Sequence, residues 1–320
     1  MTSDSTSMPP AVSDSLTPPL SDPADVDLRP LAEADDLLVA LDFDGVLAPL
    51  QDDPSLSRVL PASAEAIARI ASLPNTQLAL VSGRDVATLR ELADPPASAM
   101  IVGSHGAEID LGPGQDASGT ESAATASGTE SAATASGTES AATASAPDPT
   151  EANAVTNDEE ELLAAIDDHL AELTTLSDRE GFDLRIERKP YSRTVHTRGM
   201  APGLAASLRE HVVSVQAEHG GIRVIEGHDI TELAVSQATK GTGIRALVAE
   251  VHPTAALYLG DDITDEDAFA ELAEMRPEVT GVGIKVGSAP TQAELRIADP
   301  DDVATLLTRL ADERAEFTAS

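Results

Sequence analysis

The chain has 320 residues, room for about two domains of ordinary size, and 41% of them are hydrophobic, which excludes a wholly disordered chain. Its formal net charge is −36, from 56 acidic and 20 basic residues. A chain of this charge is repelled by nucleic acid and by anionic membrane surfaces, so we expect neither as a partner.

The first 34 residues are rich in Ser, Asp and Pro, so we interpret residues 1–34 as a disordered acidic leader. The opening MTSDSTSMPP has neither the basic nor the apolar stretch of a secretory signal, and no run approaches roughly 18 uninterrupted apolar residues. The chain has no cysteine, which excludes a disulfide framework and a thiolate nucleophile. From these features we expect a cytoplasmic protein.

Short apolar runs alternate with helical patterns in the two outer parts of the chain, as in parallel strands joined by helices. The expected strands are 37–41, 78–81, 100–102, 257–259 and 282–286, and the expected helices include 63–73, 86–92, 242–250 and 267–274. This order predicts an α/β fold with a Rossmann-like parallel sheet, built from residues 35–108 and 236–320.

The middle of the chain has a different pattern. Helices are expected at 159–173 and 205–217, and antiparallel strands at 182–188, 192–198, 222–226 and 230–235, the last two joined around Gly227-His228-Asp229. These elements predict an α+β cap, inserted at 109–235 over an active site. Within it, the nonamer ASGTESAAT occurs three times in succession over 117–143, and such small polar repeats predict a flexible insertion rather than a docking segment.

Polar clusters follow the expected strands, at the edge where open parallel sheets bind ligands. They are Asp42-Phe43-Asp44-Gly45-Val46, Ser82-Gly83-Arg84 and Gly260-Asp261-Asp262-Ile263-Thr264-Asp265, and Thr239-Lys240-Gly241 begins a helix. Each cluster alone is ordinary turn or helix-cap chemistry. Their occurrence together, in this order and strand context, indicates a shared site.

These residue types suit phosphate chemistry. Asp42 could face a phosphorus atom while Asp44 reaches the leaving oxygen, and an aspartate nucleophile forming an aspartyl-phosphate is a recognised form of covalent catalysis. Carboxylates so close together repel one another, so a hard cation such as Mg²⁺ is the natural counter-ion. Ser82 and Lys240 offer a hydroxyl and a point charge to phosphate oxygens.

On these motifs the sequence resembles the haloacid dehalogenase (HAD) superfamily and, within it, the trehalose-6-phosphate phosphatases. The finer resemblance rests on LDFDGVLAPL at 41–50, SGR at 82–84, GSHGAE at 103–108, ERKPYSRTVHTR at 187–198, YLGDDITDEDAF at 258–269, IKVG at 284–287 and ADPDDV at 298–303. It covers about residues 37–310 apart from the repeats, and implies a HAD-like core with a C2-type cap. The implied activity is Mg²⁺-dependent hydrolysis of trehalose 6-phosphate to trehalose and phosphate.

The resemblance also implies roles for individual residues. Asp42 would be the nucleophile and a metal ligand, Asp44 the general acid/base with its backbone carbonyl on Mg²⁺, and Asp261 a further ligand. Asp262 and Asp265 would support the metal, and Ser82, Gly83 and Lys240 would bind the phosphate. The residues expected to contact the substrate are Arg84, His105, Glu187, Lys189, Arg198 and Glu232. A trehalose-phosphate synthase is a conceivable partner.

Several alternatives stay open at this stage. The cap residues could form a solvated strand face, His105 could only shape its loop, Arg84 could cap a helix, and His196 fits a packed histidine better than a substrate contact. The chain departs from the family at Val46, where Thr is commoner, and in LAVSQAT after Glu232, which bears on sugar recognition. The alternative functions are a phosphatase for sucrose 6-phosphate or mannosyl-3-phosphoglycerate, and a catalytically weak sugar-phosphate-binding regulator.

The acidity itself has two explanations. An acidic interaction tail would be a block, whereas the carboxylates here run along the whole chain and only three residues are lysines, Lys189, Lys240 and Lys285. Dispersed acid and scarce lysine fit adaptation to high salt, where counterions screen self-repulsion. We therefore expect a halophilic protein.

Overall fold

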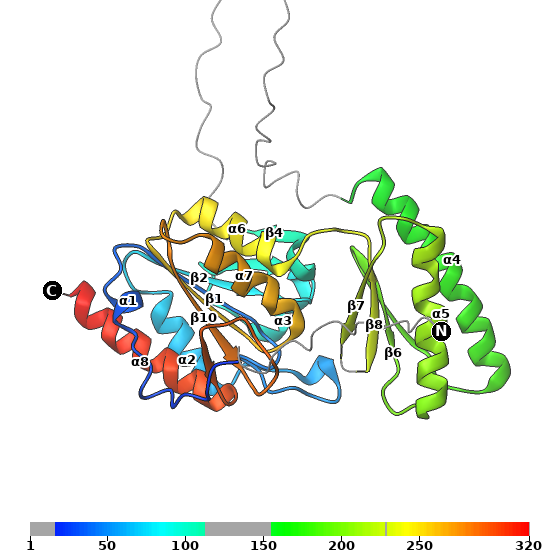
Figure 1. Ribbon diagram of the computed structural model, residues 1–320, viewed down its shortest axis with the longest axis horizontal. Helices are drawn as coiled ribbons and strands as arrows, with labels where there is room; N and C mark the ends of the chain where they lie inside the picture. The colour runs from blue at the N-terminus through cyan, green and yellow to red at the C-terminus, as the bar shows by residue number, and fades with distance from the viewer. Residues whose placement is uncertain (1–16, 113–154, 228, 320) are drawn as a thin grey trace, which may run out of the picture.

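The computed structural model describes residues 17–112, 155–227 and 229–319 and contains two lobes (Figure 1). The larger lobe is built on a seven-stranded sheet in which β3 and β4 pair antiparallel and the other neighbours are parallel. In sheet order the strands are β11 (Leu295–Ile297), β10 (Thr280–Val286), β9 (Ala255–Gly260), β1 (Leu37–Leu41), β2 (Thr76–Val81), β3 (Met100–Gly103) and β4 (Glu108–Asp110).

Helices cover both faces of this sheet, so the central strands are buried on both sides. In β1, Leu37, Val39 and Leu41 pack into one apolar cluster, while Leu38 and Ala40 pack into another. The first cluster is covered by α1 (Arg29–Ala32), α2 (Pro61–Ile70), α3 (Val86–Ala93) and α8 (Pro300–Thr318), and the second by α6 (Lys240–Val251) and α7 (Glu266–Glu274). The expected parallel α/β core is confirmed.

The smaller lobe is an antiparallel sheet with two helices on one face (Figure 1). Its order is β5 (Arg185–Lys189), β6 (Ser192–His196), β8 (Ile230–Ala234) and β7 (Arg223–Gly227), and its helices are α4 (Asn157–Glu180) and α5 (Pro202–Glu218). Val195 and Leu233 point into the core shared with the helices. Because side chains alternate along a strand, Thr194 and Glu232 point to the other face, toward the larger lobe. The cap predicted from the sequence is therefore present.

The interpretation of residues 1–34 as a disordered leader is wrong for its C-terminal part. Val26, Leu28 and Leu31 are buried in the main apolar cluster. The guanidinium of Arg314, itself buried on α8, donates hydrogen bonds to the carbonyls of Ala32 and Asn75 and so holds this segment against β2. Three apolar side chains among Asp and Pro are too few to form a periodic pattern, so their burial could not be predicted from the composition of this segment.

Some sequence predictions lie outside the described residues, namely residues 1–16, the repeats at 117–143 and His228. The core sheet also extends beyond the predicted limit of 108, because β4 pairs with β3. Residues 109 and 110 therefore belong to the core sheet. With this change of boundary, we propose the division of the chain into a core and an inserted cap. Within the described residues, we find no helix long and apolar enough to cross a membrane.

Candidate active site

The site lies at the carboxyl ends of β1, β2 and β9. Asp42 directly follows β1, and its backbone N–H donates to the carbonyl of Leu259, so the neighbouring strand fixes its position. Lys240 is the first residue of α6, where Thr239 caps the helix. The ammonium Nζ of Lys240 lies 3.0 Å from Oδ2 of Asp42 and 2.6 Å from Oδ1 of Asp265, and all three side chains are buried.

Asp42, Asp261 and Asp265 form a compact carboxylate group whose candidate ligand atoms all lie within 4.8 Å of one another. Tyr258 donates its hydroxyl to Oδ1 of Asp265 at 2.5 Å, which fixes that carboxylate. Gly45 has a φ of +75°, and a Cβ there would lie 2.1 Å from Oδ2 of Asp261. Only glycine therefore lets the loop after β1 approach Asp261 this closely.

Burial and mutual repulsion dominate the electrostatics of this group. Burial raises the pKa of Asp42 well above its usual range despite Lys240, and burial together with Asp265 raises the pKa of Asp261 to about 7. Burial would raise the pKa of Asp265 as well, but Lys240 outweighs it and the pKa is lowered. The ammonium of Lys240 pairs with Asp42 and Asp265 but not with Asp261, and an all-oxygen group with more negative than positive charge fits Mg²⁺.

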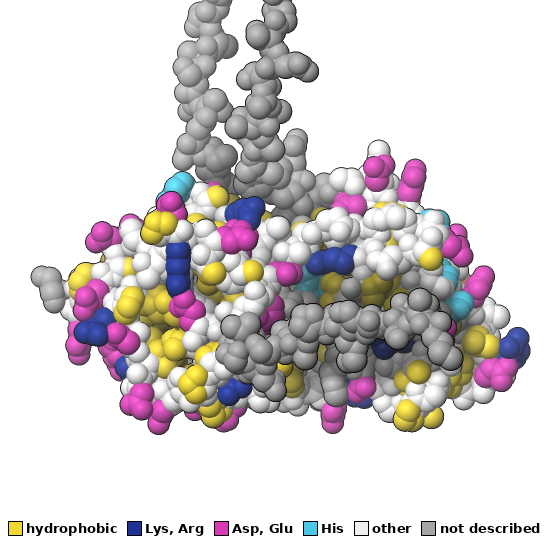
Figure 2. Space-filling view, viewed as in Figure 1, with side chains coloured by type: hydrophobic (Ala, Val, Ile, Leu, Met, Phe, Trp, Pro, Cys, Tyr) yellow, Lys and Arg dark blue, Asp and Glu magenta, His cyan; other side chains and the backbone are white. Residues whose placement is uncertain are grey.

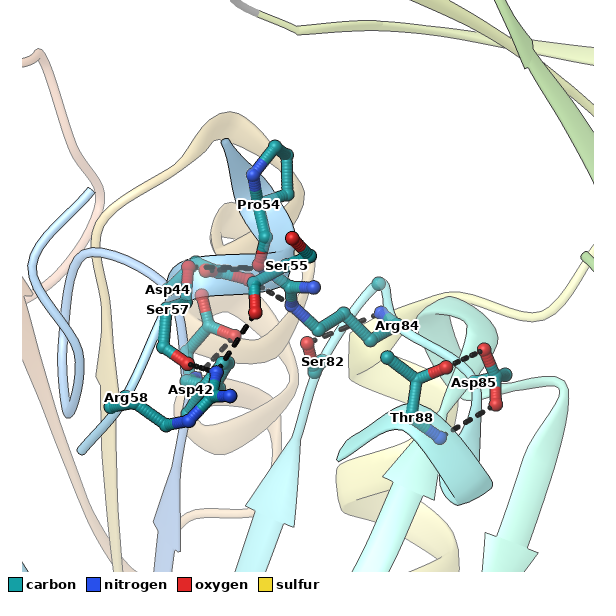
Figure 3. A network of polar contacts seen from close by, with 12 residues as sticks. Asp42, Asp44, Pro54, Ser55, Ser57, Arg58, Ser82, Arg84, Asp85 and Thr88 are labelled. Atoms are coloured by element: carbon teal, nitrogen blue, oxygen red, sulfur yellow. Dashed lines mark hydrogen bonds and ion pairs between the residues drawn. The ribbon is translucent and has the colours of Figure 1, made fainter. Parts of the chain in front are cut away.

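The metal-site residues expected from the sequence are only partly brought together. Asp42 and Asp261 lie in the carboxylate group, and Asp265, expected to support the metal, is its third member. Asp262 instead accepts a hydrogen bond from the backbone N–H of Ile263 at 2.6 Å, with its side chain at the surface. Asp44 was expected to bind the metal through its backbone carbonyl, and its side chain forms an ion pair at 2.6 Å with Arg84 (Figure 3).

Two of the residues expected to hold phosphate, Ser82 and Gly83, lie at the end of β2, and the third, Lys240, begins α6. Ser82 is buried, and its Oγ accepts a hydrogen bond from the backbone N–H of Arg84 at 3.2 Å. A Cβ on Gly83 would lie 2.4 Å from Cε1 of His105, so the histidine ring rests directly on this glycine. His105 itself has a φ of 56°, a backbone conformation that is uncommon for residues other than glycine.

Two cap residues expected to contact the substrate meet the core at this point. Lys189 donates to Oε2 of Glu232 at 3.0 Å and to the carbonyl of Gly83 at 3.2 Å. Nε2 of His105 lies 3.7 Å from the same Oε2, and Ser192 donates to Oε1 at 2.6 Å. Burial raises the pKa of Glu232, but Lys189, His105 and Ser192 outweigh burial and hold the pKa well below its usual range.

The other two expected cap residues lie further out. Glu187 is half-buried and pairs with Nε2 of His196 at 3.1 Å. Arg198 donates to the backbone carbonyls of Gln51 at 3.2 Å and Asp52 at 2.9 Å, so it joins the cap to the loop that follows the first motif. In this structure Arg198 is a cap-to-core contact.

Three residues of the site were missed in the sequence. Tyr258 supports Asp265 from inside β9, and Ser192 supports Glu232. Lys285 is buried and donates to the carbonyl of Asp262 at 3.0 Å, in the loop that carries Asp261. The signal for Lys285 was the scarcity of lysine, since all three lysines of the chain lie at this end of the sheet.

Solved structures share this architecture. The C-terminal domain of trehalose-6-phosphate phosphatase from Candida albicans matches 92% of this chain and 99% of its own, with a TM-score of 0.69 and 22% identity. The C-terminal domain of a trehalose synthase regulatory protein from C. albicans matches 90% and 96%, with a TM-score of 0.56 and 11% identity. At these identities the likeness shows the fold alone, an α/β core with a parallel sheet and a smaller α+β lobe.

A family model described as trehalose-phosphatase matches residues 40–301, and the chain belongs to that family. A probable trehalose-phosphate phosphatase of Oryza sativa is 28% identical over 91% of this chain and 72% of its own length. A trehalose-phosphate phosphatase of Mycobacterium avium is 26% identical, and the match covers 86% of this chain and 62% of the relative. An uncharacterized glycosyl hydrolase of Mycobacterium tuberculosis, 28% identical, is matched over only 18% of its length.

Proposed function

We propose that the protein hydrolyses trehalose 6-phosphate to trehalose and phosphate through an aspartyl-phosphate on Asp42. The observation that carries the proposal is the buried group of Asp42, Asp261 and Asp265 around Lys240, at the edge of the sheet and beneath the cap. Membership of the trehalose-phosphatase family supports the choice of substrate class.

In this mechanism an oxygen of Asp42 attacks the phosphorus atom and the bond to the sugar oxygen breaks. Asp44 gives that oxygen a proton, and then takes a proton from the water that cleaves the aspartyl-phosphate. Ser82, Gly83 and Lys240 hold the phosphate, and the ammonium of Lys240 offsets its charge. Mg²⁺ held by Asp42 and Asp261, with Asp265 beside them, would screen the attacking carboxylate from the phosphate.

The cap residues would hold the sugar. Glu232, Lys189 and His105 meet where the cap touches the core, and Nδ1 of His105 is buried with no hydrogen-bond partner among the described residues. Such a nitrogen can bond to a sugar hydroxyl when the substrate separates the two lobes at this point. Glu187 and Arg198, at the rim, would contact the more distant part of the sugar.

The test is phosphate release in molar KCl with Mg²⁺, with wild type and Asp42→Asn compared on a panel of esters. The panel contains trehalose 6-phosphate, sucrose 6-phosphate, mannosyl-3-phosphoglycerate, glucose 6-phosphate and p-nitrophenyl phosphate. A strong preference for the trehalose ester is expected, as is loss of turnover in Asp42→Asn. Preference for another sugar ester overturns the substrate, binding without turnover favours the regulator, and full turnover by Asp42→Asn overturns the mechanism.

A further inference from the structure

The carboxylate of Asp44 is held by a single arginine. Nε of Arg84 donates to Oδ2 of Asp44 at 2.6 Å and Nη2 donates to Oδ1 at 2.9 Å, so each oxygen receives one hydrogen bond (Figure 3). Such a two-point contact fixes both the position and the plane of a carboxyl group. The sequence had placed Arg84 on the substrate, whereas the structure directs its guanidinium to Asp44.

The guanidinium is itself held by its surroundings. Nη2 of Arg84 also donates to the carbonyl of Pro54 at 2.9 Å and to Oγ of Ser57 at 3.2 Å (Figure 3). Its central carbon lies 5.4 Å from the centroid of the Phe43 ring, within the range of a cation–π contact. Phe43 is fully buried between Asp42 and Asp44, so the arginine is anchored to the loop that carries both.

We propose that Arg84 is the positioning residue of the general acid Asp44, an inference that rests on the proposed phosphatase function. When Asp42 bonds to phosphorus, the ester P–O bond breaks and its electron pair stays on the leaving oxygen, which takes the proton of Asp44. The two N–H groups of Arg84 fix the position and the plane of the carboxyl group that supplies this proton, so the arginine orients the proton donor.

The role predicts a dependence on the leaving group. The alkoxide of a sugar must be protonated as it leaves, whereas p-nitrophenolate leaves readily without a proton. The kcat/KM value reports the steps up to departure of the leaving group, before Asp44 acts as a base. The variants Arg84→Ala, Arg84→Lys and Asp44→Asn are therefore compared by kcat/KM on trehalose 6-phosphate, phenyl phosphate and p-nitrophenyl phosphate.

We expect Arg84→Ala to lower kcat/KM by about 100-fold on the sugar ester and by less than about 10-fold on p-nitrophenyl phosphate, with phenyl phosphate between them. Added guanidinium ion should restore part of the loss in Arg84→Ala and none in Asp44→Asn. Arg84→Lys should behave like Arg84→Ala, because an ammonium cannot bond to both oxygens in one plane. The matched control is Arg90→Ala, which removes the 2.6 Å ion pair between Arg90 and Asp110, away from the site. It should leave the ratio of kcat/KM on the sugar ester to kcat/KM on p-nitrophenyl phosphate unchanged.

Equal losses of kcat/KM on all three esters would overturn the proposal. A rise in KM for the sugar ester with kcat retained would also overturn it, because it would show that Arg84 binds the substrate. If Arg84→Ala does not fold, the same comparison of kcat/KM on the sugar and aryl esters is made with Arg84→Lys and tests the proposal. If wild type hydrolyses the aryl esters but not the sugar ester, the proposed substrate fails and the phenyl-to-nitrophenyl ratio still tests Arg84. If wild type hydrolyses none, both proposals fail.

Discussion

The Nζ atom of Lys240 lies 3.0 Å from Oδ2 of Asp42, and both side chains are buried. Burial lowers the pKa of this lysine, but Asp265 and Asp42 together outweigh burial and raise it, so Lys240 is charged throughout the physiological range. The ammonium therefore holds together two buried carboxylates that would otherwise repel each other. It links α6 to the end of β1 and to the loop that follows β9.

Lys240→Met should consequently destabilise the protein as well as stop turnover. The change leaves Asp42 and Asp265 buried without their cation, and breaking a buried charge pair costs about 3–5 kcal/mol. Urea unfolding without Mg²⁺ measures this cost. Arg245→Met on the same helix is the control, because the Arg245–Glu271 pair at 2.6 Å has an exposed arginine and should contribute little. Equal unfolding midpoints for the two variants would contradict the prediction.

The sequence predicted five of the seven core strands, because buried parallel strands give short apolar runs with clear ends. It missed β4 and β11, which lie at the two edges of the sheet and have only three residues each. It also placed Asp42, Lys240 and Asp261 at one edge of the sheet, since chain order and strand ends suffice for that. It could not predict the partner of Arg84. A long side chain at the end of a strand can reach substrate or protein, and here the choice depends on Pro54 and Ser57, in a loop without periodic pattern.

The N-terminal segment gives a second prediction, because composition misled there. Deletion of residues 1–34 should lower the free energy of unfolding by several kcal/mol relative to deletion of residues 1–16. The longer deletion exposes the sites of Val26, Leu28 and Leu31, each worth about 1.5–3 kcal/mol when buried. It also removes carbonyl partners of the buried Arg314.

Urea denaturation of the two truncated proteins, with the full chain as reference, measures the difference. Arg314→Leu in the full chain is a useful companion, because it loosens the same contact without removing the apolar side chains. If both truncations unfold at the midpoint of the full chain, the burial of this segment contributes nothing to stability and the argument is wrong.

Glu232 predicts a pH dependence of stability. Its pKa is lowered in the folded protein, so its contribution to stability is present in full above its usual value of 4.5 and is lost as the pH falls below that value. Wild type should therefore be more stable than Glu232→Gln at pH 7, and the gap should shrink steadily in acid. Paired urea titrations from neutral to acidic pH measure it. A gap that is constant with pH would show that Lys189 and Ser192 do not act on the ionised carboxylate.

The acidic surface predicts a strong effect of salt, and we propose that it reflects adaptation to high salt. Acidic side chains are spread over both lobes in Figure 2, in keeping with a net charge of −36. Exposed charges repel over a screening length of about 10 Å at 0.1 M salt and about 3 Å at 1 M, so molar KCl should remove most of the repulsion.

The midpoint of thermal unfolding should therefore rise from low to molar KCl, most steeply at the dilute end, where screening changes fastest. Uncharged sucrose at matched osmolarity is the control, since it stabilises by exclusion from the surface without screening charge. The test is sharpest at pH 7 or above, where exposed carboxylates are ionised, and the salt effect should weaken in acid as they take up protons. Adaptation to salt would be contradicted if the midpoint of thermal unfolding stayed constant or fell with added KCl. It would also be contradicted if sucrose raised the midpoint as much as KCl does.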